Sequence, residues 1–318
     1  MPFAIDTMSL EPVISGLLGG IDVSGGATDE QLSLLDALCS RVWGRPDLDL
    51  GAMERLGPAD VAQAITDPNI RRRFHELHVA LEACRHPQTL EQVELVERYA
   101  EALAITGPDL ALFRSSIEQG IDRASLDYRR FLTGNVATRG EPSLGAPTDA
   151  PEPDLVARLR AFADLPEGSL GRSYFDFYEA TGLGLPGEVG SVLNHFFVAH
   201  DMTHVIAGIS TTAAGEVALS AFQMGMDDNP TNTGALLASL IAHEAGFGTP
   251  GTFDLESETL ADSGAMTLLV DELARGSSCT GDFSLVDHLA IAEVPLAEVR
   301  ERFGVPAPND PDDGHHIW

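Results

Sequence analysis

The sequence predicts an all-α protein made of two helical domains joined by a linker rich in Gly and Pro. Apolar residues recur with the 3.6-residue period of amphipathic helices, and no convincing run alternates as a half-buried strand does. The segment 133–153 reads TGNVATRGEPSLGAPTDAPEP, a composition typical of linkers. A length of 318 residues accommodates two domains of ordinary size. We therefore expect a helical domain over 1–132, a linker over 133–153 and a second helical domain over 154–318.

Two capping motifs predict helices in the first domain. Thr28 is followed three residues later by Gln31, which is the spacing of a capping box. Thr89 and Gln92 repeat this arrangement, and apolar residues at helical spacing follow both motifs. The shared pattern indicates a weak internal repeat. Further helices are expected over 58–64 and 68–84.

In the second domain, helical periodicity resumes directly after the linker. The expected helices cover 154–163, 170–181, 189–205, 211–224, 231–245, 256–275 and 296–303. The terminal segment 306–318 is rich in Pro and Asp and is expected to be frayed.

Charge and composition exclude some classes of function. The chain has 19 basic residues, all of them Arg, against 49 acidic ones, which gives a formal net charge of −30. Such a surface repels phosphate backbones and anionic lipid headgroups, so we expect no nucleic-acid partner and at most peripheral membrane association. The three cysteines show no C-x-x-C spacing, and the first residues lack the features of a signal peptide. A cytoplasmic protein is therefore expected.

One constellation carries the chemistry of a metal site. His200 and His204 lie about 40° apart on a helix, and Asp201 falls within the same arc. Gly208 is expected to end this helix, and Ser210 or Thr211 to cap the next one, which brings Glu216 back toward the histidines. Two imidazoles and two carboxylates without a thiolate suit a divalent cation such as iron, zinc, manganese or magnesium. The alternative is that the two histidines are ordinary buried residues between helices.

The pattern H-D-x-x-H, followed by Gly208, Thr211, Gly215 and Glu216, resembles the Coq-four family of ubiquinone (coenzyme Q) biosynthesis. The segment 171–177 and the stretch from Pro295 to Val305 are similar to other parts of that family. The likeness covers about 153–306. It implies an all-α fold, a divalent metal held by His200, Asp201, His204 and Glu216, and oxidative decarboxylation of a prenylated hydroxybenzoate. The family is also associated with membranes and with assemblies of biosynthetic enzymes.

Two departures from the family pattern bear on the substrate. Ser210 stands where the family has Pro, and the segment 195–198 reads HFFV where the family is Arg-rich. Losing those arginines removes a partner for a carboxylate or phosphate, so a different substrate, such as a secondary metabolite, is an open alternative. The nearby aromatic side chains either line a pocket for an aromatic or polyketide-like molecule or belong to the core; they are Phe175, Phe177, Phe196 and Phe197.

The N-terminal half, roughly 10–112, resembles the TerB-like helical domains of tellurite resistance. That family carries an acidic metal-binding signature, whereas the matching stretch here reads ACRHP over 83–87 and lacks the acidic pair. We therefore expect a helical packing or docking module in this half.

The leading hypothesis is a metal-dependent oxidative decarboxylase or oxygenase with His200, Asp201, His204 and Glu216 as its catalytic metal ligands. Its partner would be a small aromatic, prenylated or polyketide-like substrate. One alternative is a non-catalytic scaffold that binds an isoprenoid or lipid within a biosynthetic complex, and another is a metal hydrolase of the His-Asp type. A homo-oligomer is compatible with each of them.

Overall fold

A computed structural model describes residues 5–107, 112–119, 128, 143–144, 150–191, 193–247 and 257–318. The described residues form helices and turns, with two isolated β-bridges and no strand among them. The predicted all-α class is therefore confirmed for this part of the chain. Most of the expected linker over 133–153 lies outside the described residues, and a helix already begins at its last residue, Pro153.

Two helices of the first half begin at the predicted capping residues, Thr28 and Thr89. Thr28 and Gln31 form the full capping box, and the Thr89 hydroxyl accepts a hydrogen bond from the Gln92 amide. A π-helical turn over Leu38–Val42 extends the first capped helix. The helices are α1 (Thr7–Gly20), α2 (Asp29–Ala37), α3 (Pro58–Ala64), α4 (Pro68–Ala83), α5 (Leu90–Leu103) and α6 (Leu112–Gln119).

The two capping motifs meet in the interior. The Gln31 amide nitrogen lies 3.4 Å from the Gln92 side-chain oxygen, and both residues are fully buried. Gln31 also donates to the Leu81 carbonyl, and Gln92 donates to the Gly20 carbonyl. The repeated sequence pattern therefore places equivalent residues face to face, where they satisfy each other and the surrounding backbone.

The second half contains the predicted helices with shifted ends. The helix that carries His200 begins at Phe196 instead of Val189, because Gly190 takes a left-handed conformation and turns occupy the preceding residues. The helices over 170–181 and 296–303 have their predicted bounds, whereas the helix expected over 256–275 begins only at Ala265. The helices are α8 (Pro153–Arg160), α9 (Leu170–Thr181), α10 (Phe196–Ala207), α11 (Ala213–Met226), α12 (Pro230–His243), α13 (Ala265–Ser277) and α14 (Leu296–Phe303).

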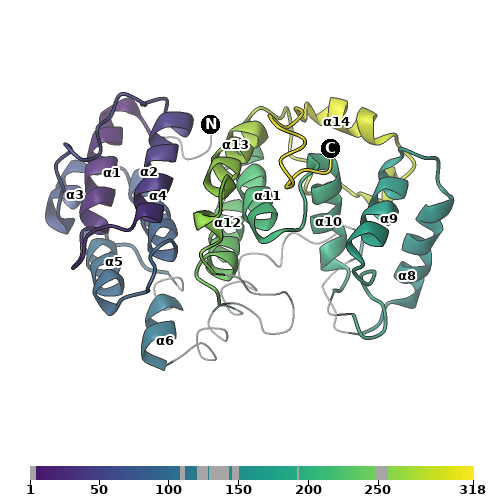
Figure 1. The fold of residues 1–318 in the computed structure, drawn as a ribbon, viewed down its shortest axis with the longest axis horizontal. Coiled ribbons are helices and arrows are strands. Elements are labelled where there is room, and N and C mark those ends of the chain that lie inside the picture. The colour runs from purple at the N-terminus through teal and green to yellow at the C-terminus, as the bar shows by residue number, and fades with distance from the viewer. Residues whose placement is uncertain are drawn as a thin grey trace.

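Close packing of α11 on α13 and α12 forms the centre of the molecule (Figure 1). Glycine permits the approach of α11 to α13: a Cβ at Gly276 would lie 2.0 Å from the Phe222 carbonyl oxygen, and one at Gly225 would lie 2.3 Å from the Leu273 carbonyl oxygen. Helix α10 lies between this centre and α9, with α14 across its end. The helix with the candidate ligands is therefore held on several sides.

The N-terminal helices pack directly on this centre. Helix α4 contacts α12, and α2 with its π-helical turn contacts α13. The buried apolar side chains of the two halves form one continuous cluster. The predicted boundaries of two domains stay a prediction, but the two halves share a core.

The terminal segment is ordered, in contrast to the fraying expected from its composition. His316 forms an antiparallel bridge with Ile209, directly after α10. The His316 side chain is nearly fully buried and contacts Glu272 and Asp313. The segment is fixed by these non-local contacts, which its composition does not reveal.

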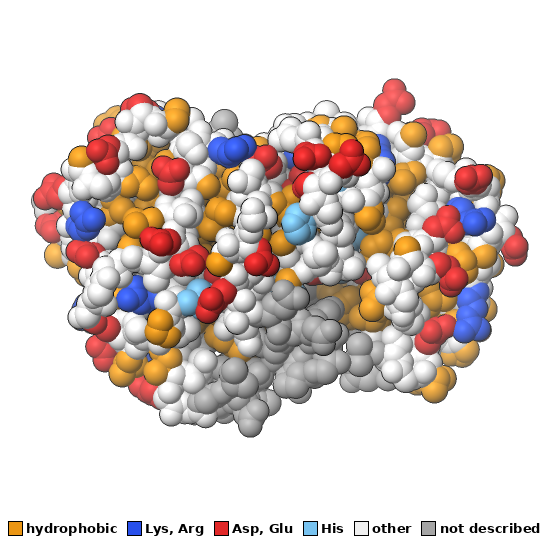
Figure 2. Space-filling view, viewed as in Figure 1, with side chains coloured by type: hydrophobic (Ala, Val, Ile, Leu, Met, Phe, Trp, Pro, Cys, Tyr) orange, Lys and Arg blue, Asp and Glu red, His pale blue; other side chains and the backbone are white. Residues whose placement is uncertain are grey.

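The surface carries the acidic excess that the sequence predicts. Figure 2 shows acidic side chains spread over both halves of one face, among apolar and uncharged ones. Among the described residues, no helix combines the length and apolar character that crossing a membrane requires.

Candidate metal centre

Helix α10 is anchored at its start by contacts outside the helix. His195 precedes the helix, and its Nδ1 lies 2.6 Å from the Glu152 carboxylate at the start of α8. Glu152 also accepts a hydrogen bond from the His195 backbone amide. His195 is therefore a structural residue that fixes the entry into α10, and it does not join the candidate ligands.

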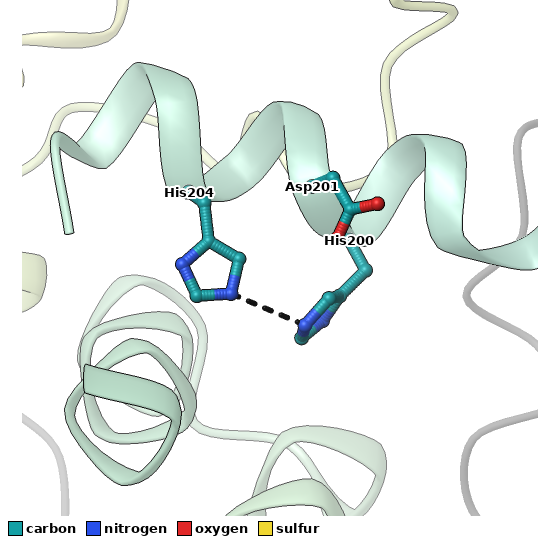
Figure 3. A group of neighbouring side chains, drawn as sticks. All are labelled: His200, Asp201 and His204. Carbon is teal, nitrogen blue, oxygen red and sulfur yellow. Dashed lines mark hydrogen bonds between the residues drawn. The ribbon is translucent and has the colours of Figure 1, made fainter. Parts of the chain in front are cut away.

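His200 and His204 lie one turn apart on α10 and project to the same side of the helix (Figure 3). Their Nε2 atoms are 3.2 Å apart. Glu216, in the first turn of α11, brings one carboxylate oxygen to 3.2 Å from the His200 Nε2 and the other to 3.3 Å from the His204 Nε2. The structure thus brings together the two histidines and the distant glutamate, which came from separate parts of the sequence pattern.

The turn between α10 and α11 produces this convergence. Gly208 ends α10 with φ 67°, as its position predicts. The cap of α11 is Thr212, rather than Ser210 or Thr211, and its hydroxyl accepts from the Gly215 amide. A Cβ on Gly215 would lie 2.2 Å from the Ser210 carbonyl oxygen, so only glycine fits there. Glu216 directly follows this tight turn.

Asp201 belongs to the cluster but has a second partner. One ligand atom from each of His200, Asp201 and His204 lies within 4.8 Å of the others. The Asp201 carboxylate also accepts a hydrogen bond from the Tyr178 hydroxyl of α9, and both residues are buried. Asp201 is therefore held from the side of α9, while Glu216 approaches the histidines from α11.

Burial and mutual contact shift the pKa values of the cluster. Burial raises the pKa of Asp201 to about 6. The neighbouring histidines lower this pKa, but their effect is the smaller one. Burial also disfavours the ionised forms of His204 and Glu216, but the attraction between these oppositely charged groups has the larger effect on both pKa values. The Glu216 carboxylate raises the pKa of His204, and the two histidines hold the pKa of Glu216 well below its usual range. The cluster therefore carries mutually stabilising charges in a buried setting.

A backbone carbonyl fixes the orientation of His204. The Ile209 carbonyl oxygen lies 3.0 Å from the His204 Nδ1, which must donate because a carbonyl only accepts. The Nε2 atom is then the ring nitrogen that faces His200 and Glu216, and it offers its lone pair to a metal when the ring is neutral. Metal-binding histidines are oriented in this way by a second partner on the ring.

An apolar cavity of about 120 Å³ adjoins the cluster. His200 and Glu216 form part of its wall, together with Phe196 and Phe197. Its other described lining residues are Tyr128, Ala199, Ser220, Gln223, Ala235, Ala238, Ser239, Ala242, His243 and Ser284. Two of the metal candidates, His200 and Glu216, therefore face a small, mostly apolar space with a few polar groups, as ligand sites commonly do.

The four phenylalanines singled out from the sequence divide between cavity and core. Phe196 and Phe197 line the cavity. Phe177 stacks against the His204 ring, with centroids 6.1 Å apart, and Phe175 packs against the core. Only the pair at the start of α10 therefore contacts the space beside the cluster.

Tyr178 was not predicted as a site residue, although it directly follows the segment 171–177. A tyrosine one turn after Tyr174 on an amphipathic helix gives no local sign that it reaches a residue on α10. Gln223 of the cavity wall was not predicted for the same reason, since it lies on an apolar stretch of α11.

The donor set fits a divalent cation. Imidazole nitrogens and carboxylate oxygens converge, no thiolate takes part, and the His204 ring is fixed with Nε2 facing the cluster. Such ligands suit zinc, ferrous iron or manganese. The structure thus contains a His-Asp cluster that could bind a metal.

Comparison with known proteins finds similarity in structure but none to a family model or a curated protein. No protein-family model matches the chain, and no curated protein matches it significantly. A structural search finds similarity to a crystal structure from Nostoc punctiforme PCC 73102, whose name assigns it provisionally to ubiquinone biosynthesis. The match covers 76% of this chain and 100% of that one, with 20% sequence identity and a TM-score of 0.35.

Proposed function

We propose that the chain is a metal-dependent enzyme that acts on a small aromatic molecule bearing oxygen substituents. The observation that carries this proposal is that His200, His204 and Glu216 converge, and that two of them, His200 and Glu216, form part of the wall of an apolar cavity. A metal bound only for structural support would not need to adjoin such a space.

The reaction we propose is the oxidative decarboxylation of a hydroxylated aromatic carboxylate, which the resemblance to the Coq-four motif implies. The bond between ring carbon and carboxylate breaks and releases CO₂, while a C–O bond forms at the same carbon. One oxygen atom of O₂ enters the product as a hydroxyl. The other leaves as water and takes up two protons and two electrons from an added reductant.

The bound metal would hold substrate oxygens and act as a Lewis acid or redox centre. His200, His204, Glu216 and Asp201 would supply its ligands. The Phe196 and Phe197 rings would hold the aromatic ring and exclude water from the cavity.

Polar groups on the cavity wall would orient the substrate. Ser220 and Gln223 lie on α11 on the same helix as Glu216, and Ser239 and His243 lie on α12 opposite. Hydroxyl, amide and imidazole groups at these positions can bind the oxygen substituents of a ring and set its orientation toward the cluster.

Elemental analysis and oxygen consumption test the proposal together. We expect protein purified without chelator, or reconstituted anaerobically with Fe²⁺ or Mn²⁺, to retain a single equivalent of metal per chain. Metal-loaded protein should then consume O₂ and release CO₂ with hydroxybenzoates and ascorbate. Glu216→Gln should lower metal affinity on the order of 10-fold or more, because it removes a charged ligand. Glu298→Gln, at an exposed site on α14, is the matched control and should change neither the metal affinity nor the O₂ consumption.

The outcome separates the alternatives. Retained zinc with phosphodiesterase activity and no O₂ consumption would replace this proposal with a metal hydrolase. A retained apolar ligand without turnover would replace it with a binding scaffold. Absence of metal after anaerobic reconstitution would overturn the enzyme as proposed.

A further inference from the structure

The terminal segment contacts the chain immediately after His204. The Ile317 amide donates to the Gly208 carbonyl at 2.9 Å, and the Ser210 amide donates to the His315 carbonyl at 2.8 Å. These two hydrogen bonds lie on either side of Ile209, which pairs with His316 in the antiparallel bridge. Ile209 is the residue whose carbonyl accepts the hydrogen bond from His204.

The same segment also contacts the start of α11. The His315 Nδ1 lies 3.2 Å from the hydroxyl of Thr212, the residue that caps α11. Glu216 follows in the first turn of that helix. The segment therefore contacts the end of the helix that carries the histidines and the beginning of the helix that carries the glutamate.

Arginines complete the contacts at the end of α10. The last carbonyls of a helix have no partner within the helix. Here Arg300 donates to the carbonyls of Val205 and Ile206, and Arg275 donates to the carbonyl of Ala207. Ile317 supplies the next donor in this series, to Gly208. Positive side chains at this end also interact favourably with the helix dipole.

The terminal segment is itself fixed in place. The Trp318 ring lies 3.7 Å from the guanidinium carbon of Arg300. The His316 Nε2 lies 3.2 Å from the Glu272 carboxylate, and Glu272 in turn binds Arg275. The arginines that hold the end of α10 and the segment that pairs with Ile209 thus form one connected network.

We propose that residues 315–317 are a positioning element of the metal centre. Their backbone hydrogen bonds hold the Ile209 carbonyl, and that carbonyl keeps the His204 ring with Nδ1 protonated and Nε2 directed at Glu216. The effect of this element on metal affinity rests on the proposed function. The orientation of His204 in the metal-free protein does not depend on that function.

The variant Ile317→Pro tests the inference because proline lacks the amide that donates to Gly208. Ile317→Ala is the matched control, since it keeps that amide and shortens only a half-exposed side chain. Circular dichroism at the assay temperature establishes that each variant is folded. If the proline variant is not folded, Trp318→Ala, which releases the segment from Arg300, replaces it with a smaller expected effect.

Two measurements follow. Long-range ¹H–¹⁵N correlation spectra of the metal-free protein, recorded at alkaline pH where the His204 ring is neutral, report the His204 tautomer, and we expect Nδ1–H in the wild type and in Ile317→Ala but a mixture in Ile317→Pro. Competition with a chelator reports Co²⁺ affinity, which should fall about 10-fold in Ile317→Pro and stay unchanged in Ile317→Ala.

The outcomes separate this inference from the proposed function. An unchanged tautomer and unchanged Co²⁺ affinity in folded Ile317→Pro would overturn the positioning role. If wild-type protein binds no Co²⁺ but the tautomer changes in Ile317→Pro, the positioning role stands and the metal-dependent function fails.

Discussion

At the scale of single residues, the hydrogen bond from Tyr178 to Asp201 both holds this carboxylate in place and affects its ionisation. The Tyr178 hydroxyl donates to a buried carboxylate, and a hydrogen bond to the ionised form lowers the pKa of Asp201. Burial acts in the opposite direction and is the larger effect, so that pKa is raised to about 6. Asp201 is therefore poised to exchange a proton near neutral pH.

Replacing Tyr178 with Phe should make metal binding more sensitive to acid. Without the hydroxyl, the ionised form of Asp201 loses a partner, so its pKa should rise above about 6. A proton then competes with the metal over a wider range. We expect Co²⁺ affinity of Tyr178→Phe, relative to wild type, to be lower at about pH 6 than at about pH 8.

The control for this comparison is Tyr99→Phe. Its hydroxyl donates to the Leu56 carbonyl in the N-terminal half, so the variant also loses a buried tyrosine hydrogen bond. It should lose stability on the order of 1–3 kcal/mol without a change in Co²⁺ affinity. An affinity ratio for Tyr178→Phe that is the same at both pH values would contradict the role given to this contact.

At the scale of secondary-structure elements, the end of α10 is a site where backbone geometry and packing act together. Gly208 has φ 67°, and a Cβ there would lie 2.9 Å from the Trp318 ring and 3.2 Å from the Arg300 guanidinium. Gly182 ends α9 with a similar φ of 70°, but nothing lies within 4 Å of the position of its Cβ. The two glycines share the conformation and differ in their surroundings.

Gly208→Ala should therefore destabilise the protein more than Gly182→Ala. Both variants carry the cost of a left-handed residue with a side chain, about 1–2 kcal/mol. Gly208→Ala must in addition displace the terminal segment, so its loss of Co²⁺ affinity should accompany the larger loss of stability. Chemical denaturation and chelator competition measure the two effects. Equal destabilisation by the two alanines would show that the contact with Trp318 is unimportant.

The helix ends also show what a sequence reveals. Thr28, Thr89 and Gly208 mark ends correctly because capping depends on residues within one turn. The start of α10 was misplaced because it depends on Gly190 and on the pairing of His195 with Glu152, which is distant in sequence. Helix ends that local capping sets are therefore predictable from the sequence, whereas helix ends that distant contacts set are not.

The residues of the candidate site likewise divide into those that local sequence spacing predicts and those that only tertiary packing brings to the site. His200, Asp201 and His204 follow from helical spacing, and Glu216 follows from a short turn between helices, so all four were predictable as neighbours. Tyr178 and the segment 315–317 reach the site through tertiary packing of α9 and of the chain end, which one sequence without its fold does not contain. Whether the four residues bind metal stays a prediction.

At the scale of the whole molecule, the two halves are joined by buried polar contacts as well as by the shared core. Glu244 is fully buried, and its carboxylate lies 2.9 Å from the His86 Nε2. Its other oxygen accepts from the Leu260 amide. The residue before it, His243, lines the cavity beside the metal candidates. A contact from the N-terminal half thus supports the end of α12 next to the site.

Removing this contact should destabilise both halves together. His86→Ala leaves a buried Glu244 oxygen without its partner, at a cost of about 1–3 kcal/mol, whereas His86→Gln retains a donor and should cost less. Although burial opposes it, Glu244 raises the pKa of His86 above its usual 6.5. The stability gained from the charged pair is therefore fully present below 6.5 and is lost as pH rises through the higher folded-state pKa.

We accordingly expect the stability difference between wild type and His86→Ala to be larger at about pH 6 than at about pH 9. Fluorescence of Trp43, in the N-terminal half, and of Trp318, at the chain end, can follow denaturation in single-tryptophan variants. Because the halves share one core, the two probes should report coincident transitions that shift together in His86→Ala. Separate transitions, with only the Trp43 signal shifted, would instead establish two domains that unfold independently. The N-terminal half would then not stabilise the end of α12 beside the cavity.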